Sequence, residues 1–490
     1  FNSDTDTEVI IQLCSYYTNK GYDNKDAFFK TIGRLEGAFA LCFMFKDDEE
    51  KLYVTRRSAP LVIGYGKKDV FVGSDAVSLS NLIESVIFLD EDDVAIVSKK
   101  QTNIYDKFGE RVNRKKKSVD LNSDIISKGN YQHFMLKEIH EQPEVFGYAT
   151  SSFINFKTHK IEMLNEIKEL DNVDRLIFVA CGTAYYACAV AKFWFEKYVK
   201  VPVEIDVASE FRYRDTPFSK NEYAIFVSQS GETADTLAAL RKVKGKVNKT
   251  ISIVNVVESS IARESEFVLP IKAGPEIGVA STKAFTAQLA VLACLAINFS
   301  NKRGLISRKE NSELIDELVS VPGIMSNIIK KTPIYKEFAK KLMKAKNALF
   351  LGRGILYPLA LEAALKLKEI SYIHAEGYPS GELKHGPIAL VDKKMPVICF
   401  APVNNLFEKT ISNVQEVQAR NGKVLLITDD EGASCLNQNE ISMIKLPKFS
   451  NFISPIIYAI PSQLIAYYTA LYKGTDIDKP RNLAKSVTVE

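Results

Sequence analysis

The sequence predicts an α/β protein in which two doubly wound parallel sheets follow each other along the chain. From about residue 172 onward, short apolar runs typical of buried strands alternate with helical stretches, an order that favours a parallel sheet. The same order of strands, turns and helices returns roughly 170 residues later, when corresponding turns of the two stretches are aligned. Residues 1–106 lack this alternation and are rich in strand-like segments separated by turn residues.

The composition is that of an ordinary globular protein. Of the 490 residues, 46% are hydrophobic and 25% are charged, and the formal net charge is only +4. This balance argues against nucleic acid as the main partner, and no apolar run reaches the length of a membrane span. The first residues lack a signal-peptide pattern, and the 7 cysteines are scattered without a CxxC pair. We therefore expect a cytoplasmic protein with reduced thiols, without a metal and without a cofactor.

The N-terminal part should combine strands with a few helices. Helices are predicted at residues 9–20, 24–33 and 76–82. The strand candidates are Ala38–Phe45, Lys51–Thr55, Val70–Val72 and Val94–Val97. Residues 107–150 are polar and basic, with one helical patch around Tyr131–Glu141, and are predicted to be an interdomain linker.

The two sheets are predicted in residues 151–310 and 335–475, followed by a tail at 476–490. The strands expected in the first are Arg175–Ala180, Val203–Val207, Ala224–Val227, Thr250–Val257 and Phe267–Pro270, before a helix at 281–299. The strands expected in the second are Ala348–Leu351, Pro396–Phe400 and Lys423–Thr428, with a helix at Tyr357–Ile370.

A hydroxyl-rich turn follows the strand Ala224–Val227. Ser228, Ser230 and Thr233 supply hydroxyl groups, Gln229 supplies an amide, and the turn leads into a helix whose first N–H groups are unpaired. Gly231 allows the backbone to turn tightly. This combination favours a phosphate site built from neutral donors over an ordinary helix cap, which one serine would satisfy. The second copy has Ala401–Asn405 at this place, so the phosphate site is expected in the first copy alone.

Two other loops should lie beside this turn, because ligands of parallel sheets bind at the carboxyl ends of the strands. These loops are Cys181–Thr183 and Gly278–Ser281. Cys181 could be a nucleophile, but no histidine is near it in the sequence. A packing role is favoured for it, since free cysteines are usually small buried hydrophobic residues.

Charged residues that could do chemistry lie in the second copy and in the tail. Glu362, Lys366 and Glu369 share one helix face, which is either a solvated ion-pair stripe or part of a cleft where a carboxylate moves a proton between sugar carbons. His385, in a turn before Gly386-Pro387, is either structural or an acid/base group that opens a sugar ring. Lys485 lies in a tail that would normally be frayed, but a docked lysine could form a Schiff base with a sugar carbonyl.

Five segments together resemble the isomerising glutamine:fructose-6-phosphate aminotransferases. They are Val227–Thr236, Glu276–Phe285, Leu367–Glu376, Gly381–Pro387 and Pro480–Glu490. The resemblance implies two sugar isomerase (SIS) domains, preceded by the C-terminal part of an α+β glutaminase domain of the N-terminal-nucleophile class at 1–106. It implies conversion of fructose 6-phosphate and glutamine-derived ammonia to glucosamine 6-phosphate, the first step of amino-sugar biosynthesis.

The resemblance also implies roles for single residues. The phosphate would be held by Ser228, Gln229, Ser230 and Thr233, and the sugar would be lined by Cys181, Gly182, Thr183, Val279, Ser281 and Glu362. Lys485 would form an imine at C2, and Glu369 would shuttle a proton between C1 and C2, with Lys366 nearby. His385 would reach the site of the neighbouring subunit, which implies a homodimer.

The glutaminase part is expected to be incomplete. Asp6 matches the residue that holds the amino group of glutamine, while the nucleophilic cysteine that precedes it in this family is absent from the sequence. We expect this chain not to hydrolyse glutamine. The alternatives to an aminotransferase are a sugar-phosphate-binding regulator on the same duplicated fold and a plain phosphosugar isomerase. Lys485, Glu369 and the N-terminal block argue against the regulator, and the N-terminal block argues against the plain isomerase.

Overall fold

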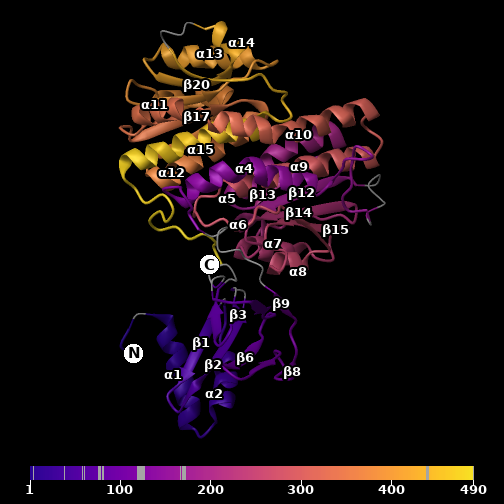
Figure 1. Cartoon of the computed structure of the whole chain (residues 1–490), viewed down its shortest axis with the longest axis vertical. Coiled ribbons are helices and arrows are strands. Elements are labelled where there is room, and N and C mark those ends of the chain that lie inside the picture. Colours follow the sequence, from indigo (N-terminus) through magenta and orange to yellow (C-terminus); the bar gives the residue numbers. More distant parts are fainter. Residues whose placement is uncertain are drawn as a thin grey trace. The chain divides into compact units, whose positions relative to one another are not determined.

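The protein is seen in a computed structural model that describes residues 1–488 except 4, 38, 58, 60, 75–78, 80–81, 119–126, 166, 168–172 and 437–440. The short helix expected at 76–82 falls mainly outside the described residues. The chain forms two compact units, one of residues 1–127 with 487–490 and one of residues 128–486. Figure 1 shows the elements of each unit along the sequence.

In its described residues the N-terminal unit combines helices α1 (Asp6–Asn19) and α2 (Asn24–Ile32) with two antiparallel sheets, as expected. One sheet has the order β1 (Phe39–Phe45), β2 (Asp48–Arg57), β6 (Val94–Ser98), β7 (Thr102–Tyr105) and β8 (Arg111–Val112). The other has the order β4 (Val70–Gly73), β3 (Val62–Tyr65), β5 (Ser85–Phe88) and β9 (Lys116–Ser118). Buried apolar residues of both sheets, including Val54, Ile63 and Ile87, form a shared core.

The second unit contains the first of the two predicted parallel sheets. Its order is β13 (Val203–Val207), β12 (Arg175–Ala180), β14 (Glu222–Ser228), β15 (Lys249–Val254) and β16 (Phe267–Pro270). All four strand pairings are parallel. The strand order reverses direction between β12 and β14, and ligands of such sheets bind at this switch point. The helices of this half are α5 (Gly182–Trp194), with a π-helical turn at Phe195–Val199, α6 (Ala208–Phe211), α7 (Ala234–Val243), α8 (Ser260–Glu264) and α9 (Lys283–Lys302).

The second sheet repeats this order, which confirms the predicted duplication. Its strands are β18 (His374–Pro379), β17 (Asn347–Gly352), β19 (Pro396–Phe400), β20 (Lys423–Asp429) and β21 (Ser442–Leu446). Its helices are α11 (Thr332–Leu342), α12 (Tyr357–Ser371), α13 (Phe407–Gln418), α14 (Asp430–Ser434) and α15 (Ser454–Lys473). At its switch point a Cβ on Gly354 would lie 2.9 Å from Leu406 Cδ1, so the loops after β17 and β19 pack closely there.

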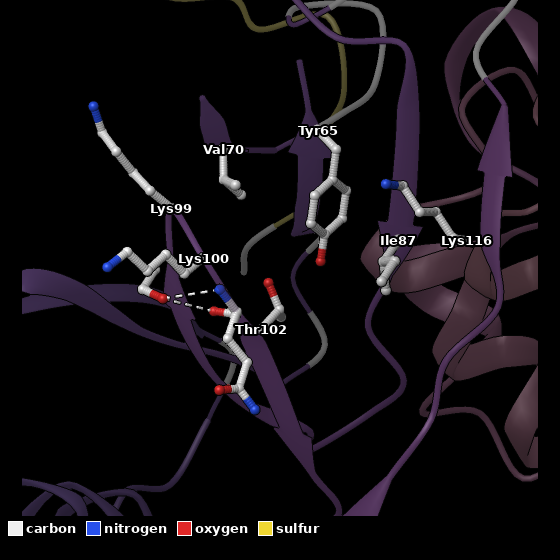
Figure 2. Close-up of a pocket in the computed structure, with 9 residues that line it drawn as sticks. Tyr65, Val70, Ile87, Lys99, Lys100, Thr102 and Lys116 are labelled. Carbon is white, nitrogen blue, oxygen red and sulfur yellow. Dashed lines mark hydrogen bonds between the residues drawn. The ribbon is translucent and has the colours of Figure 1, made fainter. Parts of the chain in front are cut away.

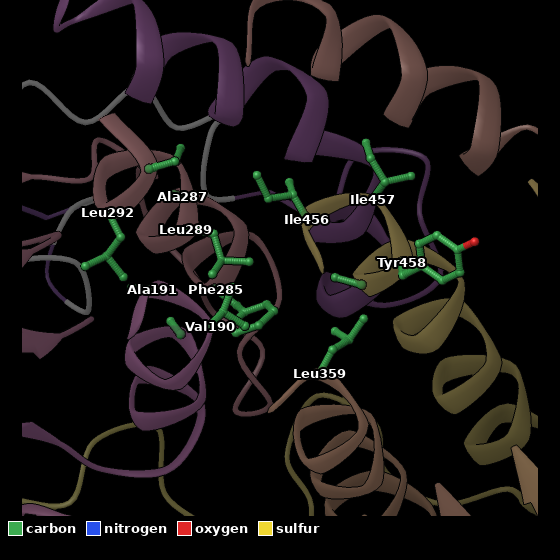
Figure 3. Close-up of a cluster of buried hydrophobic side chains, with 14 of the residues drawn as sticks. Val190, Ala191, Phe285, Ala287, Leu289, Leu292, Leu359, Ile456, Ile457 and Tyr458 are labelled. Atoms are coloured by element: carbon green, nitrogen blue, oxygen red, sulfur yellow. The ribbon is translucent and has the colours of Figure 1, made fainter. Parts of the chain in front are cut away.

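A layer of helices joins the two sheets. Figure 1 shows α4 (Phe134–Ser151), α9, α10 (Arg308–Ile329) and α15 between them. Their buried side chains form one core with residues of β12, β14, β17 and β19. Figure 3 shows Val190 of α5 and Phe285 of α9 near Leu359 of α12 and Ile456 of α15. The two halves therefore share a continuous hydrophobic core, and this core fixes their relative positions.

The stretch predicted as a linker, 107–150, contains β8, β9 and most of α4. Met135, Ile139 and Phe146 of α4 are buried in the shared core, so this helix belongs to the sheet unit. The helix continues through Pro143, which has no N–H to pair with the carbonyl of Ile139. The Gln142 side-chain amide donates to that carbonyl at 3.1 Å instead.

By length and composition alone, helix α9 could cross a membrane, contrary to the expectation that no apolar run reaches that length. Within the residues that the structure describes, 94% of its most apolar window is buried inside the fold. Such burial is typical of a helix in the core of the fold.

Candidate active site

The hydroxyl-rich turn lies at the switch point of the first sheet. Ser228 ends β14, and its Oγ accepts a hydrogen bond from the Gly231 N–H at 3.0 Å and lies 3.0 Å from Thr233 Oγ1. The Oγ of Ser230 accepts from the Glu232 N–H at 3.1 Å. Gly231 has φ +67, and a Cβ there would lie 1.9 Å from Ser259 Oγ, so glycine is required on two grounds. The turn leads directly into α7, whose N-cap residue is Thr233.

The loop after β12 stands beside this turn. Gly182 has φ +53, and Cys181 is the residue just before α5. Burial raises the pKa of the Cys181 thiol, and the Thr236 hydroxyl lies 3.9 Å from its sulfur. A thiol that stays protonated is a poor nucleophile, which favours the packing role for Cys181.

Thr183 connects this loop to charged residues of the second half. Lys366 Nζ of α12 donates to Thr183 Oγ1 at 3.0 Å, and Thr183 Oγ1 donates to Glu362 Oε1 at 3.2 Å. Lys366 also pairs with Glu369 at 2.6 Å and lies 3.6 Å from Glu362. The side chains of Glu362 and Lys366 are almost fully buried, whereas that of Glu369 is 20% exposed. The helix face seen in the sequence is therefore largely buried beside Thr183 and is not a solvated stripe, and Glu369 is its partly exposed carboxylate.

Burial sets the charges of this cluster. It raises the pKa of Glu362 to about 8, against the opposing effect of the Lys366 ammonium. For Lys366, burial lowers the pKa, but the interactions with Glu362 and Glu369, including the short contact with the Glu369 carboxylate, outweigh burial and raise it. The shorter contact identifies Glu369 as the ion-pair partner of Lys366. Glu362 is then a neutral carboxyl group near pH 7, and Lys366 is a cation.

The tail brings Lys485 to the loop before α9. Its Nζ pairs with Glu276 Oε2 at 2.6 Å and donates to the Gly278 carbonyl at 2.8 Å. The Lys485 side chain is 26% exposed, and that of Glu276 is fully buried. The next residue, Ser486, has its Oγ 3.0 Å from Ser230 Oγ, so the tail also touches the hydroxyl-rich turn.

Glu276 organises the loop that carries two predicted sugar-lining residues. Its carboxylate accepts hydrogen bonds from the Thr282 and Ala284 N–H groups at 2.9 and 3.0 Å and from Ser281 Oγ at 2.8 Å. Burial would raise its pKa, but the Lys485 ammonium and these N–H groups outweigh burial and lower it. No role for Glu276 was predicted from the sequence, although it begins the segment Glu276–Phe285 that carries the family resemblance.

The C-terminal tail is anchored before it reaches the site. The Asp478 carboxylate accepts hydrogen bonds from the N–H groups of Phe134 and Met135, the first residues of α4, at 2.9 and 3.0 Å. The Asp478 carbonyl accepts from the Val279 N–H at 3.0 Å. Further along, the Arg481 N–H donates to the Tyr372 hydroxyl at 3.0 Å. These contacts explain why a segment at the end of the chain is ordered.

Two comparisons with known sequences agree with this geometry. The SIS domain family matches residues 169–298 and 341–473, which contain the two sheets. A glutamine–fructose-6-phosphate aminotransferase (isomerizing) of Bradyrhizobium diazoefficiens is 48% identical over all of this chain and 81% of its own length. The enzyme of the same name from Brucella abortus is 49% identical, with the same coverage.

The chain belongs to the isomerising glutamine–fructose-6-phosphate aminotransferase family. A solved structure, the C-terminal domain of the aminotransferase of this family from Francisella tularensis, is 43% identical and has a TM-score of 0.70. The alignment covers 72% of this chain and 99% of that domain. Duplicated SIS sheets are thus the fold of this aminotransferase family as well as of this chain.

The two remaining predicted aminotransferase residues are His385 and Asp6. His385 ends a 3₁₀ segment, Ser380–His385, and is exposed without a hydrogen bond or ion pair to any residue that the structure describes. Asp6 lies at the start of α1 in the N-terminal unit.

The N-terminal unit also has an open pocket of about 260 Å³, shown in Figure 2. Tyr65, Thr102 and Lys116 are among the residues that line it, and none of the predicted aminotransferase residues does. We assign it no part in the active site.

Proposed function

We propose that this chain converts fructose 6-phosphate, with ammonia derived from glutamine, to glucosamine 6-phosphate. The observation that carries the proposal is the position of Lys485. Its amine is held by Glu276, while the adjacent Ser486 touches Ser230 of the hydroxyl-rich turn. An amine beside a phosphate site is what the capture of a sugar-phosphate carbonyl requires.

The phosphate end is assigned to Ser228, Gln229, Ser230 and Thr233. A phosphate that accepts hydrogen bonds from these side chains would also face the N-terminus of α7, whose partial positive charge attracts anions. In the structure Ser228 and Thr233 hydrogen-bond to each other. We infer that these hydroxyl groups turn toward phosphate oxygens when the sugar binds.

At the other end of the sugar, Lys485 would form the imine. Its nitrogen attacks the C2 carbonyl of the open-chain ketose, the C–N double bond forms, and the carbonyl oxygen leaves as water. Ammonia then replaces the lysine nitrogen at C2. Glu276 holds the amine before substrate arrives, and its full burial keeps water from competing for that contact.

Glu369 would move the proton that changes a ketose into an aldose. It takes a proton from C1 and returns one to C2, which leaves an aldehyde at C1 and an amino group at C2. Lys366 holds Glu369 at 2.6 Å and fixes its carboxylate. Thr183, Val279 and Ser281, from two other loops, would line the sugar between these groups.

The remaining assignments concern the second subunit, glutamine and the cellular compartment. His385 is exposed, so a second copy of the chain in a homodimer could bring it to the sugar to assist ring opening. Asp6 is assigned to the amino group of glutamine. All 7 cysteines are free, which fits a protein that works in the reducing cytoplasm. A regulatory role on the same fold is not favoured, because binding alone would need neither Lys485 nor Glu369.

The proposal is tested by product analysis with fructose 6-phosphate and ammonium chloride, followed by NMR. The expected product is glucosamine 6-phosphate, and both Lys485→Ala and Glu369→Gln should abolish its formation. Formation of an aldose phosphate without nitrogen would identify a plain phosphosugar isomerase. Binding of the sugar phosphate without any turnover would favour the regulator.

A further inference from the structure

Glu138 is a buried carboxylate that none of the steps above uses. It lies on α4, is 2% exposed, and comes from the stretch that the sequence suggested was a linker. Its Oε1 accepts hydrogen bonds from the backbone N–H groups of Ile277 and Gly278, the latter at 3.1 Å. Buried carboxylates that accept such bonds fix the backbone that donates them.

The segment held in this way is central to the site. Glu276, the partner of Lys485, immediately precedes the two N–H groups. The Gly278 carbonyl accepts from Lys485, and the Val279 N–H donates to the tail at Asp478. A shift of Ile277 and Gly278 would therefore move both oxygen atoms that hold the Lys485 amine.

We propose that Glu138 is a positioning residue of the imine-forming lysine, acting through the backbone of Ile277 and Gly278. Glu138 clamps the loop from its buried side, and the loop in turn presents Glu276 and the Gly278 carbonyl to Lys485. This inference rests on the proposed role of Lys485. It adds α4, which is outside both matched SIS segments, to the machinery of the site.

The fit between Glu138 and Gly278 supports a specific clamp. A Cβ on Gly278 would lie 2.8 Å from Glu138 Oε2, so the close approach depends on glycine at this position. Oε2 is buried and has no hydrogen-bond partner among the described residues, so Oε1 is the oxygen that holds the loop. Burial and the neighbouring Glu276 raise the pKa of Glu138, and a neutral carboxyl group still accepts through Oε1.

The experiment compares rates of borohydride trapping of fructose 6-phosphate on variants of the full chain. Glu138→Ala removes the acceptor, Glu138→Gln keeps an oxygen acceptor without a negative charge, and Gly278→Ala pushes on the same contact from the loop. Glu222→Ala is the matched control. Glu222 is also a buried carboxylate, 5% exposed, and it accepts from the Ser219 N–H at 3.0 Å, but it begins β14 at the opposite end from the site.

Glu138→Ala should slow trapping by about 100-fold, the loss expected when reacting groups are displaced by about 1 Å. Glu138→Gln should stay within about threefold of the wild type, because both hydrogen bonds persist. Gly278→Ala should be slowed, and Glu222→Ala should trap normally even if it melts at a lower temperature.

Two results would overturn the inference while the proposed function stands. One is a normal trapping rate in a folded Glu138→Ala or Gly278→Ala variant. The other is an equal loss of trapping rate in Glu138→Ala and Glu138→Gln. If Glu138→Ala does not fold, Gly278→Ala decides alone. Failure of the wild type to trap sugar would count instead against the proposed role of Lys485.

Discussion

Replacing Gly231 by alanine should damage the hydroxyl-rich turn more than any conformational penalty alone can explain. Its φ of +67 costs an alanine about 1–2 kcal/mol. The new Cβ would also lie 1.9 Å from Ser259 Oγ and 2.5 Å from Ser259 Cβ. Displacing a buried side chain in this way costs about 1–3 kcal/mol. The expected loss in free energy of unfolding is therefore about 2–5 kcal/mol.

Gly245→Ala separates the two contributions. Gly245 has φ +76 on a turn after α7, and a Cβ there would meet no atom within 4 Å. This control should lose only about 1–2 kcal/mol. Urea unfolding of the full chain measures both losses, and calorimetry measures the affinity for fructose 6-phosphate. Gly231→Ala should bind the sugar phosphate weakly, whereas Gly245→Ala should bind it normally.

A second substitution tests the cause of the damage. In the double variant Gly231→Ala with Ser259→Gly, the atoms that the alanine would strike are gone, so the part of the loss due to the clash should be recovered. The reasoning would be refuted if Gly231→Ala were no less stable than Gly245→Ala, or if it bound the sugar phosphate as well as the wild type.

Three further predictions concern the charged residues. The neutral form of Glu362 stabilises the fold, so its contribution is complete at acid pH and is lost as the pH rises from 4.5 through about 8. The melting temperature of Glu362→Gln should therefore depend less on pH over this range than that of the wild type. An unchanged pH dependence would contradict the assignment. Lys366→Met leaves the Glu369 carboxylate without its cation and should cost about 3–5 kcal/mol in urea unfolding, where a loss below 1 kcal/mol would argue against a buried ion pair. Asp478→Ala should free the tail from α4, cost about 0.5–2 kcal/mol, and expose the tail to limited proteolysis; a tail that stays protected would mean that Asp478 is not its anchor.

The parallel sheets could be predicted because their signals are local. The predicted bounds are correct for the strands Arg175–Ala180 and Phe267–Pro270, because each is a short apolar run that ends at turn residues. The loops after β12 and β14 were expected to lie together because ligands bind at the carboxyl ends of parallel strands, and the strand order places both at the switch point.

The contacts that build the site could not be predicted in this way. Lys485 meets Glu276 across 209 residues, and Glu138 meets Ile277 across 139 residues. Neither pairing leaves a periodic pattern, because each depends on how α4 and the tail pack on a folded sheet. The helical patch around Tyr131–Glu141 was predicted, but only as part of a linker, because its flanks are polar. Helix α4 extends beyond that patch through Pro143, where the Gln142 side chain donates to the carbonyl that proline leaves free.

The central claim is that the Lys485 amine reacts with the sugar carbonyl. Borohydride reduction of the full chain with fructose 6-phosphate, followed by peptide mapping, tests it most directly. The account predicts a stable secondary amine on Lys485 and no adduct in Lys485→Ala. An adduct on Lys366, or saturating sugar binding with no adduct on any lysine, would contradict it.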